Sequence, residues 1–478
     1  MFIRSQRVHF IGIGGIGMSG IAEILLTLGH RVSGSDLKAS PITRRLAGLG
    51  AVIFEGHTAA NVQDADVVVT TSALSLQNPE VAAARARGIP VIQRAEMLAE
   101  LMRLKYGVAI AGMHGKTTTT SMVASVLAAG GLDPTVVVGG RVEALGSSAR
   151  LGRSQYLVAE ADESDRSFLK LSPILAVVTN IDREHMDCYR DMDDVEHAFV
   201  DFMDRVPFYG ASIACLDDAR LAAVLPRVRR RVLTYGMAEA ADFRLEVVAR
   251  HPAETRFTVH HKGSRLGPFR LHVAGTHNLR NAGAAVAAGV QLEVPAASIA
   301  EGVAAFRGVD RRFEHKGTER GVTVVDDYGH HPTEIRATLE AARQQEFRRI
   351  LVLFQPHRYT RTRDLLEEFR SCFDAADLVW VLDIYAASEP PIPGVDAASL
   401  VRAIGRLGIT YAESFEAAAH QIAQEATDGD LVLTMGAGNV HGAAGMVLQA
   451  LAGESPAKVG QTLKNPKKLE VSPGAPLL

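Results

Sequence analysis

Short apolar segments alternate with helix-length segments along almost the whole of this 478-residue chain. Segments of strand length lie at 8–13, 31–36, 66–72, 106–112, 156–162, 175–181, 212–217, 322–328, 349–355, 378–384 and 430–436. Strands separated by helices are typical of parallel sheets, because the crossover between parallel strands is long enough to form a helix. The chain is therefore predicted to fold as α/β domains.

The strand pattern restarts twice, and a chain of this length is expected to form two to four domains. We predict a Rossmann-like first domain over 1–104 and a Rossmann-like α/β third domain over 315–452. The central domain, 105–314, is expected to hold a mostly parallel sheet. Each boundary is expected to be accurate to several residues.

Two regions depart from this pattern. Residues 256–261 and 269–273 alternate polar and apolar side chains at short spacing, which indicates an antiparallel edge on the central sheet. Residues 453–478 lack hydrophobic periodicity and are rich in proline, glycine and lysine. This tail is expected to be disordered.

The composition limits the class of protein. The 51 basic and 54 acidic residues nearly cancel, so charge supplies no argument for a nucleic-acid partner. Three widely separated cysteines, Cys188, Cys215 and Cys372, form neither a disulfide framework nor a CxxC motif. No uncharged apolar stretch approaches the roughly twenty residues of a membrane helix. We expect a cytoplasmic protein without membrane insertion.

A glycine loop follows the first predicted strand. Gly12-x-Gly14-x-x-Gly17 stands between that strand and a predicted helix, and Asp36 ends the next strand. This is the context of a dinucleotide-binding loop, in which the helix N-terminus receives a pyrophosphate. The same geometry serves any pyrophosphate, so the loop alone leaves NAD and other nucleotides open.

A second loop, 111–118, joins a strand to a helix and reads AGMHGKTT. It is a shortened phosphate loop, because Ile110 stands where the full motif has glycine. Backbone N–H groups can cradle phosphates, Lys116 supplies a positive charge, and the Thr117 hydroxyl can bind Mg²⁺. These features predict ATP binding and a central domain of the P-loop ATPase type.

An acid and an imidazole follow later strands of the same domain. Glu160 and His185 stand at strand ends, where α/β sheets place ligands. They could hold a metal ion, although His185 could equally be a packed or capping histidine. The remaining carboxylates of the loop are Asp162, Glu163 and Asp165. Such a cluster beside a phosphate loop favours Mg²⁺ over a merely exposed acidic loop.

Seven strings, in order, resemble the ATP-dependent Mur ligases of bacterial cell-wall synthesis. They are GIGGIGMSGIAEIL (12–25), AGMHGKTTTT (111–120), EADESDRSFL (160–169), NIDREHMD (180–187), HNLRNA (277–282), DDYGHHP (326–332) and FQPHRYTRT (354–362). The resemblance runs from about residue 7 to about residue 450. It implies an enzyme that phosphorylates a substrate carboxylate with ATP and joins the acyl phosphate to an amino acid's amine.

Within the family, the resemblance implies the alanine-adding branch, with UDP-N-acetylmuramate, L-alanine and ATP as ligands. It implies two Mg²⁺ ions, with Mn²⁺ as a substitute, and a monomer or weak homodimer. The UDP-sugar is expected to contact Gly12, Gly14, Gly15, Gly17, Asp36 and Ser72. The muramoyl and alanine end is expected to contact Tyr328, His330, Arg358 and Arg361.

The resemblance also assigns the ATP site. The residues expected to contact ATP are Gly112, Met113, His114, Gly115, Lys116, Thr117, Thr118, Asn278, Asn281, Arg312 and Asp327. Lys116, Glu160 and His185 are the expected catalytic residues, and Thr117, Glu160 and His185 the expected metal ligands. Helix capping by Asn278 remains open, as does an interdomain salt bridge for Arg312.

Two positions depart from the family. Met113 replaces the usual threonine, with little expected effect because the loop binds phosphate through its backbone. Several relatives support the second metal with a carbamylated lysine, but no lysine occurs between Lys170 and Lys262. That absence agrees with the alanine-adding branch.

Three other functions are weighed against this one. A ligase that attaches a whole tripeptide to the same UDP-sugar shares the central domain, but the first and last strings favour the alanine-adding branch. An NAD-dependent oxidoreductase leaves the second loop and the third domain unexplained. A regulatory nucleotide-binding protein leaves Lys116, Glu160 and His185 without a role.

Overall fold

The computed structural model describes residues 5–71, 77–142, 147–252 and 254–453. The chain divides into two compact units. Unit 1 comprises Met1–Glu314 and Arg336–Glu346, and unit 2 comprises His315–Ile335 and Phe347–Leu478. Ser72 and residues 454–478 of the predicted tail lie outside the described residues. The predicted domain limits stay predictions.

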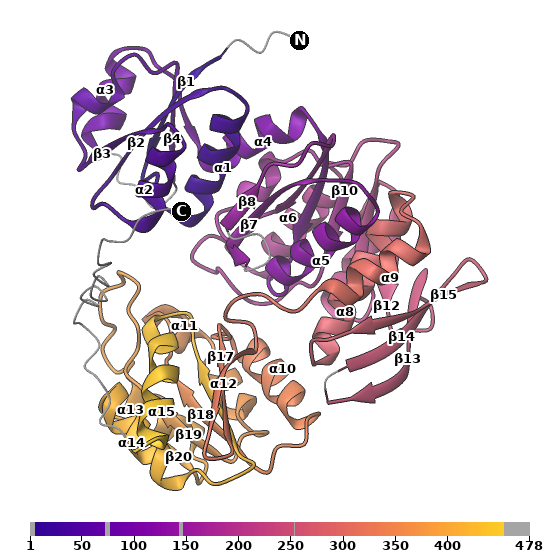
Figure 1. The fold of residues 1–478 in the computed structure, drawn as a ribbon, viewed down its shortest axis with the longest axis vertical. Helices are drawn as coiled ribbons and strands as arrows, with labels where there is room; N and C mark the ends of the chain where they lie inside the picture. Colours follow the sequence, from indigo (N-terminus) through magenta and orange to yellow (C-terminus); the bar gives the residue numbers. More distant parts are fainter. Residues whose placement is uncertain (1–4, 72–76, 143–146, 253, 454–478) are drawn as a thin grey trace, which may run out of the picture. The chain divides into compact units, whose positions relative to one another are not determined.

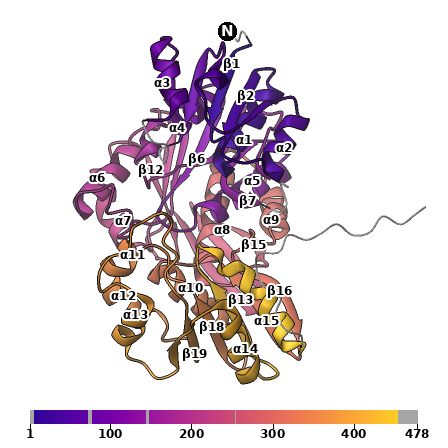
Figure 2. The same ribbon diagram turned by 90° about the vertical axis from the view of Figure 1, so that its left-hand side faces the viewer.

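The first sheet of unit 1 is parallel, with strand order β3-β2-β1-β4-β5. Its strands are β1 (Arg7–Ile11), β2 (Arg31–Asp36), β3 (Val52–Glu55), β4 (Val67–Thr70) and β5 (Val91–Gln93). The connecting helices are α1 (Ile16–Thr27), α2 (Pro41–Gly48), η1 (Ala59–Val62), α3 (Pro79–Ala86) and α4 (Arg94–Arg103). Helices α1 and α2 lie beside β1 and β2 (Figure 2). This is the predicted Rossmann-like arrangement.

The second sheet of unit 1 has ten strands in the order β15-β14-β13-β12-β11-β10-β6-β9-β7-β8. The strands are β6 (Tyr106–Ala111), β7 (Thr135–Val142), β8 (Ser147–Arg150), β9 (Tyr156–Glu160), β10 (Leu175–Val178), β11 (Ala211–Cys215), β12 (Val232–Gly236), β13 (Phe243–His251), β14 (Glu254–His261) and β15 (Ser264–Leu271). The middle of the sheet is parallel, and β13, β14 and β15 form the predicted antiparallel edge (Figure 1). A second antiparallel pair, β7 and β8, closes the other edge.

One helix of this region, α5 (Lys116–Ala129), begins at the phosphate loop. The others are α6 (Met192–Met203), α7 (Ala219–Val224), α8 (Thr276–Gln291) and α9 (Ala296–Ala305), with short turns η3 (Ser167–Lys170) and η4 (Leu225–Arg227). Helix α5 packs closely on α9, since a methyl group at Gly302 would lie 2.5 Å from the Val126 Cα. The Ser125 hydroxyl donates to the Gly302 carbonyl at 2.7 Å. This packing fixes the helix that begins at Lys116.

Unit 2 is built on a six-stranded sheet with the order β16-β17-β21-β18-β19-β20. Its strands are β16 (Glu314–Glu319), β17 (Val322–Asp327), β18 (Ile350–Phe354), β19 (Leu378–Val381), β20 (Ile409–Tyr411) and β21 (Leu431–Met435). Its helices are α10 (Pro332–Arg343, which belongs to unit 1 from Arg336 on), α11 (Tyr359–Asp364), α12 (Leu366–Cys372), α13 (Ala397–Ile404), α14 (Phe415–Glu425), η5 (Asn439–Gly442) and α15 (Ala443–Leu451). Together with unit 1, it confirms the prediction of three α/β domains.

The predicted strands form, but several end earlier than expected. The segment 8–13 is a strand only to Ile11, and 175–181 only to Val178. Beyond β1, the Gly12 and Ile13 N–H groups share one acceptor, the Ser35 carbonyl of β2, so the regular ladder ends there. Beyond β10, the Thr179 N–H still donates to the Ala111 carbonyl of β6, while the Thr179 hydroxyl turns to the His114 carbonyl of the phosphate loop. Short or half-buried strands such as β3, β5 and β20 were not predicted, because three or four residues carry little periodicity.

One apolar core extends through unit 1, from Val8 and Phe10 of the first sheet to Val108, Val158 and Val177 of the second. Such continuous burial explains why these strands are runs of valine, isoleucine and leucine. Among the described residues, no helix combines the length and apolar character needed to cross a bilayer.

Candidate active site

The first glycine loop turns sharply between β1 and α1. Gly12 has a φ of +79°, which favours glycine, and the Gly12 and Ile13 N–H groups donate to the Ser35 carbonyl at 2.8 and 3.0 Å. Helix α1 has Gly15 as its N-cap, without a side-chain cap. The first N–H groups of a helix have no partner within the helix, so this end can receive an anion.

Asp36 at the end of β2 supports this loop. Its Oδ2 accepts a hydrogen bond from the Gly14 N–H at 2.8 Å, and its Oδ1 accepts one from the Leu37 N–H at 2.8 Å. The carboxylate is therefore engaged by the backbone of the loop. Its predicted contact with the UDP-sugar stays a prediction.

The second glycine loop joins β6 to α5. Gly112 and Gly115 have φ values of +134° and +82°, conformations that side chains disfavour. A methyl group at Gly112 would lie 2.0 Å from the Thr179 Oγ1. These two glycines are therefore required by the backbone path of the loop.

Two residues that follow β10 hydrogen-bond to the backbone of this loop. The Asn180 Oδ1 accepts from the His114 N–H at 2.9 Å, and its Nδ2 donates to the His114 carbonyl at 2.9 Å. The Thr179 hydroxyl also donates to that carbonyl, at 2.7 Å. We did not single out either residue from the sequence, although both follow an apolar strand directly.

Lys116 lies beside a buried carboxylate. Its ammonium donates to Glu163 Oε1 at 2.7 Å and to the carbonyls of Gly112 and Met113 at 2.7 and 3.2 Å. Burial raises the pKa of Glu163 to about 7, although the charge of Lys116 opposes that shift. Burial alone would lower the pKa of Lys116, but the charge of Glu163 more than offsets it and raises the pKa. The lysine is therefore charged and poised at the phosphate loop.

The structure places the three predicted metal ligands in different surroundings. His185 has a φ of +56°, and its Nε2 lies 3.6 Å from Glu163 Oε1 and 3.9 Å from Glu184 Oε2. Glu160 is half-buried at the end of β9, and Thr117 lies in the first turn of α5. The carboxylate beside His185 and Lys116 is thus that of Glu163, which the sequence placed in an acidic cluster without a role of its own.

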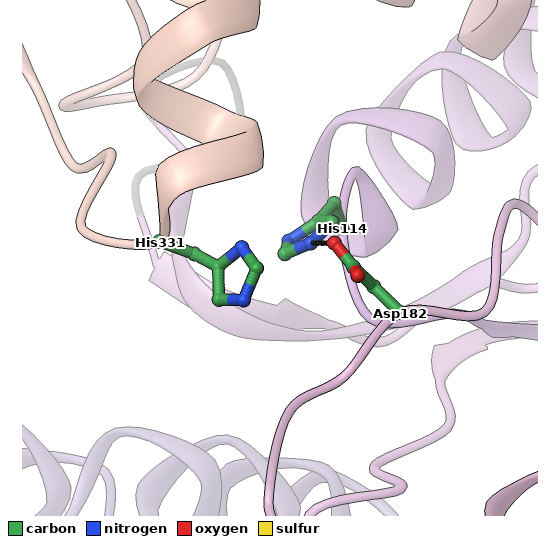
Figure 3. Close-up of side chains that lie close together, drawn as sticks. All are labelled: His114, Asp182 and His331. Carbon is green, nitrogen blue, oxygen red and sulfur yellow. Dashed lines mark hydrogen bonds and ion pairs between the residues drawn. The ribbon is translucent and has the colours of Figure 1, made fainter. Parts of the chain in front are cut away.

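His114 makes a further polar contact at the phosphate loop. Its Nε2 lies 2.9 Å from Asp182 Oδ2, and both side chains point toward each other in Figure 3. Asp182 follows β10 by a few residues, so this contact ties the loop to the same strand end as Asn180 does. His331, drawn in the same figure, belongs to unit 2.

The two asparagines expected at the ATP site lie on the first turns of α8. Asn278 Nδ2 donates to the Ala274 carbonyl at 2.7 Å, and Asn281 Nδ2 approaches Asn278 Oδ1 at 3.4 Å. A methyl group at Gly115 would lie 2.9 Å from Asn281 Oδ1. Asn281 therefore lies at the phosphate loop. Arg312 also belongs to unit 1, where its N–H donates to the Val309 carbonyl at 3.0 Å.

Unit 2 gathers its predicted residues where β17 and β18 end. Both strands run parallel to β21, so their carboxyl ends share one edge. The rings of Tyr328 and His330 are 5.4 Å apart, and those of His330 and His357 are 5.6 Å apart. His357 in turn stacks on Tyr385 at 5.5 Å. The structure thus brings Tyr328 and His330 together and adds two rings that the sequence did not single out.

The two predicted arginines lie on the same edge of unit 2. Arg361 Nη1 lies 3.0 Å from His357 Nδ1, and Arg358 has a φ of +71°. Arg358 Nη1 approaches Glu389 Oε1 at 3.9 Å. Asp327 is buried and its Oδ1 accepts from the Gly329 N–H at 2.8 Å. Guanidinium groups are suited to binding a carboxylate, but the predicted contact of these residues with the muramoyl and alanine end stays a prediction.

Three sequence models of one family match consecutive parts of the chain. Residues 7–106 match the Mur ligase family catalytic domain, 110–289 the Mur ligase middle domain, and 311–438 the Mur ligase glutamate ligase domain. The chain therefore belongs to the Mur ligase family, which confirms the resemblance drawn from the seven strings.

Particular relatives are similar over nearly the whole chain. The UDP-N-acetylmuramate–L-alanine ligase of Acidobacterium capsulatum is 65% identical over 96% of this chain and 100% of its own. That of Koribacter versatilis is 62% identical over 95% and 98%. The crystal structure of the UDP-N-acetylmuramate–alanine ligase of Thermotoga maritima covers 94% of this chain and 99% of its own, at 29% identity and a TM-score of 0.76.

Proposed function

We propose that this protein joins L-alanine to the carboxylate of UDP-N-acetylmuramate at the expense of ATP, which provides a precursor of peptidoglycan. The observation that carries the proposal is the charged Lys116 held by Glu163 in a phosphate loop, within a chain at least 62% identical to two ligases of that name. The alternative is the ligase that attaches a tripeptide to the same UDP-sugar.

The reaction proceeds in two transfers. A carboxylate oxygen of UDP-N-acetylmuramate attacks the γ-phosphorus of ATP, the β–γ bridging bond breaks, and ADP leaves. The amine of L-alanine then attacks the acyl carbon, loses a proton and displaces inorganic phosphate. In phosphoryl transfer the protein acts by position and charge, and Lys116 is placed to neutralise charge on the phosphates.

The residues at the phosphate loop fit Mg²⁺. Mg²⁺ prefers oxygen ligands, and Glu163 is fully buried with an Oε2 that has no hydrogen-bond partner among the described residues. Thr117, Glu160 and His185 are proposed to hold the metal, together with Glu163. Bound Mg²⁺ offsets negative charge on the phosphates. We propose two ions, which Mn²⁺ can replace.

The remaining roles follow the division of the chain. The loop 12–17 with Asp36 is proposed to bind the UDP pyrophosphate, supported by its open helix N-terminus. Asn278, Asn281, Arg312 and Asp327 are proposed to contact ATP. The ring and guanidinium groups of unit 2, Tyr328, His330, Arg358 and Arg361, are proposed to bind the muramoyl and alanine end.

The proposal is tested by phosphate release from ATP with Mg²⁺ and UDP-N-acetylmuramate, with L-alanine or the tripeptide in separate tubes. Release that depends on L-alanine supports the proposal. Release with the tripeptide alone reassigns the protein to the second ligase. No release with either, while ATP still binds, overturns the catalytic assignment.

We further propose a cytoplasmic protein that is a monomer or a weak homodimer. Its three cysteines are free thiols, two of them buried, as expected in a reducing compartment. Sedimentation over a hundredfold range of concentration tests the oligomeric state, and a tight dimer at the lowest concentration contradicts it.

A further inference from the structure

Arg94, the first residue of α4, lies between the first turn of α1 and the loop that follows β9. Its guanidinium Nη2 donates to Asp162 Oδ2 at 3.2 Å, and a quarter of its side chain is exposed. Asp162 belongs to the loop that follows β9 and that also carries Glu163, the ion partner of Lys116. Arg94 therefore contacts the carboxylate loop of the phosphate site directly.

The other side of Arg94 lies against Gly17, the last glycine of the first motif, in the first turn of α1. A methyl group built at Gly17 would lie 3.0 Å from Arg94 Nη1 and 3.2 Å from its Cδ. Gly17 has no positive φ, so its backbone conformation does not require glycine. The neighbour that a side chain at position 17 would meet is the arginine.

Asp162 is also fixed by hydrogen bonds within its own loop. Its Oδ1 accepts from the Ser164 N–H at 3.0 Å and from the Ser164 hydroxyl at 2.6 Å. The carboxylate that accepts from Arg94 therefore has a defined position.

A second ion pair ties α4 to the far end of the same carboxylate loop. Lys170, which ends η3, donates to Glu96 in the first turn of α4. Glu96 also accepts from the Gln93 N–H at 2.9 Å and so caps the helix. The N-terminal turn of α4 is thus attached to both ends of the carboxylate loop, while Arg94 lies against Gly17 in the first turn of α1.

We propose that Arg94 is a positioning residue that sets the pyrophosphate-binding loop in register with the carboxylate loop of the phosphate site. This inference rests on the proposed function. The UDP-sugar is anchored at one loop and its carboxylate must reach the phosphorus at the other. A fork of two contacts, on Gly17 and on Asp162, fixes that separation more rigidly than a single charge does.

The test compares Arg94→Ala and Arg94→Lys with wild type, and uses Arg103→Ala on the same helix as the matched control. Arg103 is largely exposed and pairs only with Glu100 among the contacts described. For Arg94→Ala we expect kcat/KM for UDP-N-acetylmuramate to fall about 10- to 100-fold, with the KM for ATP within twofold of wild type. Arg94→Lys restores part of the loss, and Arg103→Ala changes neither constant.

A double-mutant cycle with Gly17→Ala separates positioning from loss of structure. In wild type, Gly17→Ala displaces the arginine and lowers kcat/KM, whereas in the Arg94→Ala background it costs less. Gly48→Ala, where a methyl group meets nothing within 4 Å, is the matched glycine control. An equal cost of Gly17→Ala in both backgrounds overturns the proposal, as does an equal rise of both KM values with Arg94→Ala.

Two further measurements test the role of Arg94 if Arg94→Ala does not fold or if the proposed function is wrong. If Arg94→Ala fails to fold in thermal melts, Arg94→Lys carries the test, and unchanged kcat/KM in that variant overturns the proposal. If the wild type releases no phosphate with L-alanine, the proposed function fails by itself. Calorimetric binding of UDP-N-acetylmuramate to wild type and Arg94→Lys then tests the arginine, and equal affinities refute its role.

Discussion

The two glycine loops of unit 1 share one plan, a strand followed by a turn and a helix, yet they are supported differently. The first loop is held by Asp36, which accepts from Gly14. The second is held by Asn180, which bonds both the N–H and the carbonyl of His114, and it contains a lysine paired with a buried carboxylate. The shared plan supplies a helix N-terminus that can receive an anion, and the added charge is the reason we propose phosphoryl transfer at the second loop and binding alone at the first.

Removal of the Lys116 charge, which only the second loop carries, is expected to have the largest effect on activity. Lys116→Met should lower kcat about 1,000-fold, because the phosphates lose a preorganised positive charge. Binding of UDP-N-acetylmuramate, measured by calorimetry, should stay within threefold. Lys262→Met, at an exposed hairpin turn, is the control and should keep wild-type activity. If Lys116→Met retains more than a tenth of wild-type activity, the proposed role of Lys116 is wrong.

Loss of the two hydrogen bonds from Asn180 to the second loop is expected to have the next largest effect on activity. Asn180→Ala removes both hydrogen bonds to the His114 backbone, and the KM for ATP should rise about 100-fold as the loop loses its geometry. Asn180→Asp retains an acceptor for the His114 N–H but loses the donor, so its KM should be intermediate. Steady-state kinetics at saturating UDP-sugar measure both, and equal values would refute the geometric argument.

Loss of Asp36, which holds the first loop, should have a smaller effect, and only on the binding of UDP-N-acetylmuramate. Asp36→Ala removes one charged acceptor for the Gly14 N–H, and the KM for UDP-N-acetylmuramate should rise about tenfold. The KM for ATP should not change. Asp36→Asn, which keeps an oxygen acceptor, should recover most of the loss, and a change in the KM for ATP would show that the loops are not independent.

The smallest effect on activity, with a large one on stability, is expected at Glu80. This buried carboxylate accepts from Ser35 and Asn61 at 2.6 Å and faces His9 and His57. Burial alone would raise the pKa of Glu80, but hydrogen bonds from these partners lower it to about 2. Its carboxylate therefore stabilises the fold above about pH 4.5, and this contribution is lost as the pH falls toward 2.

Glu80→Gln should accordingly lower the free energy of unfolding by about 3 kcal/mol at pH 7, with kcat within twofold. The difference from wild type should shrink as the pH falls from 5 to 3. Urea unfolding across that range measures it. A difference independent of pH would mean that the charge of Glu80 contributes nothing to stability.

Local patterns explain what could be predicted from the sequence. Both loops and most strands of the sheets follow from glycine spacing and apolar runs, which depend on neighbours in the chain. Arg94 and Asp162 are 68 residues apart, and no local pattern pairs them. Likewise, four acids occur between residues 160 and 165, and only the folded chain shows that Glu163 turns toward Lys116.

Helix α4 makes the position of Arg94 relative to β6 depend on the number of residues between them. It begins at Arg94, and two residues after it ends the chain enters β6, the strand that leads into the phosphate loop. One inserted residue within α4 would rotate Arg94 by about 100° and shift it about 1.5 Å relative to β6. A residue inserted at the exposed turn between β14 and β15 would leave this spacing unchanged, whereas one inserted in α4 would not.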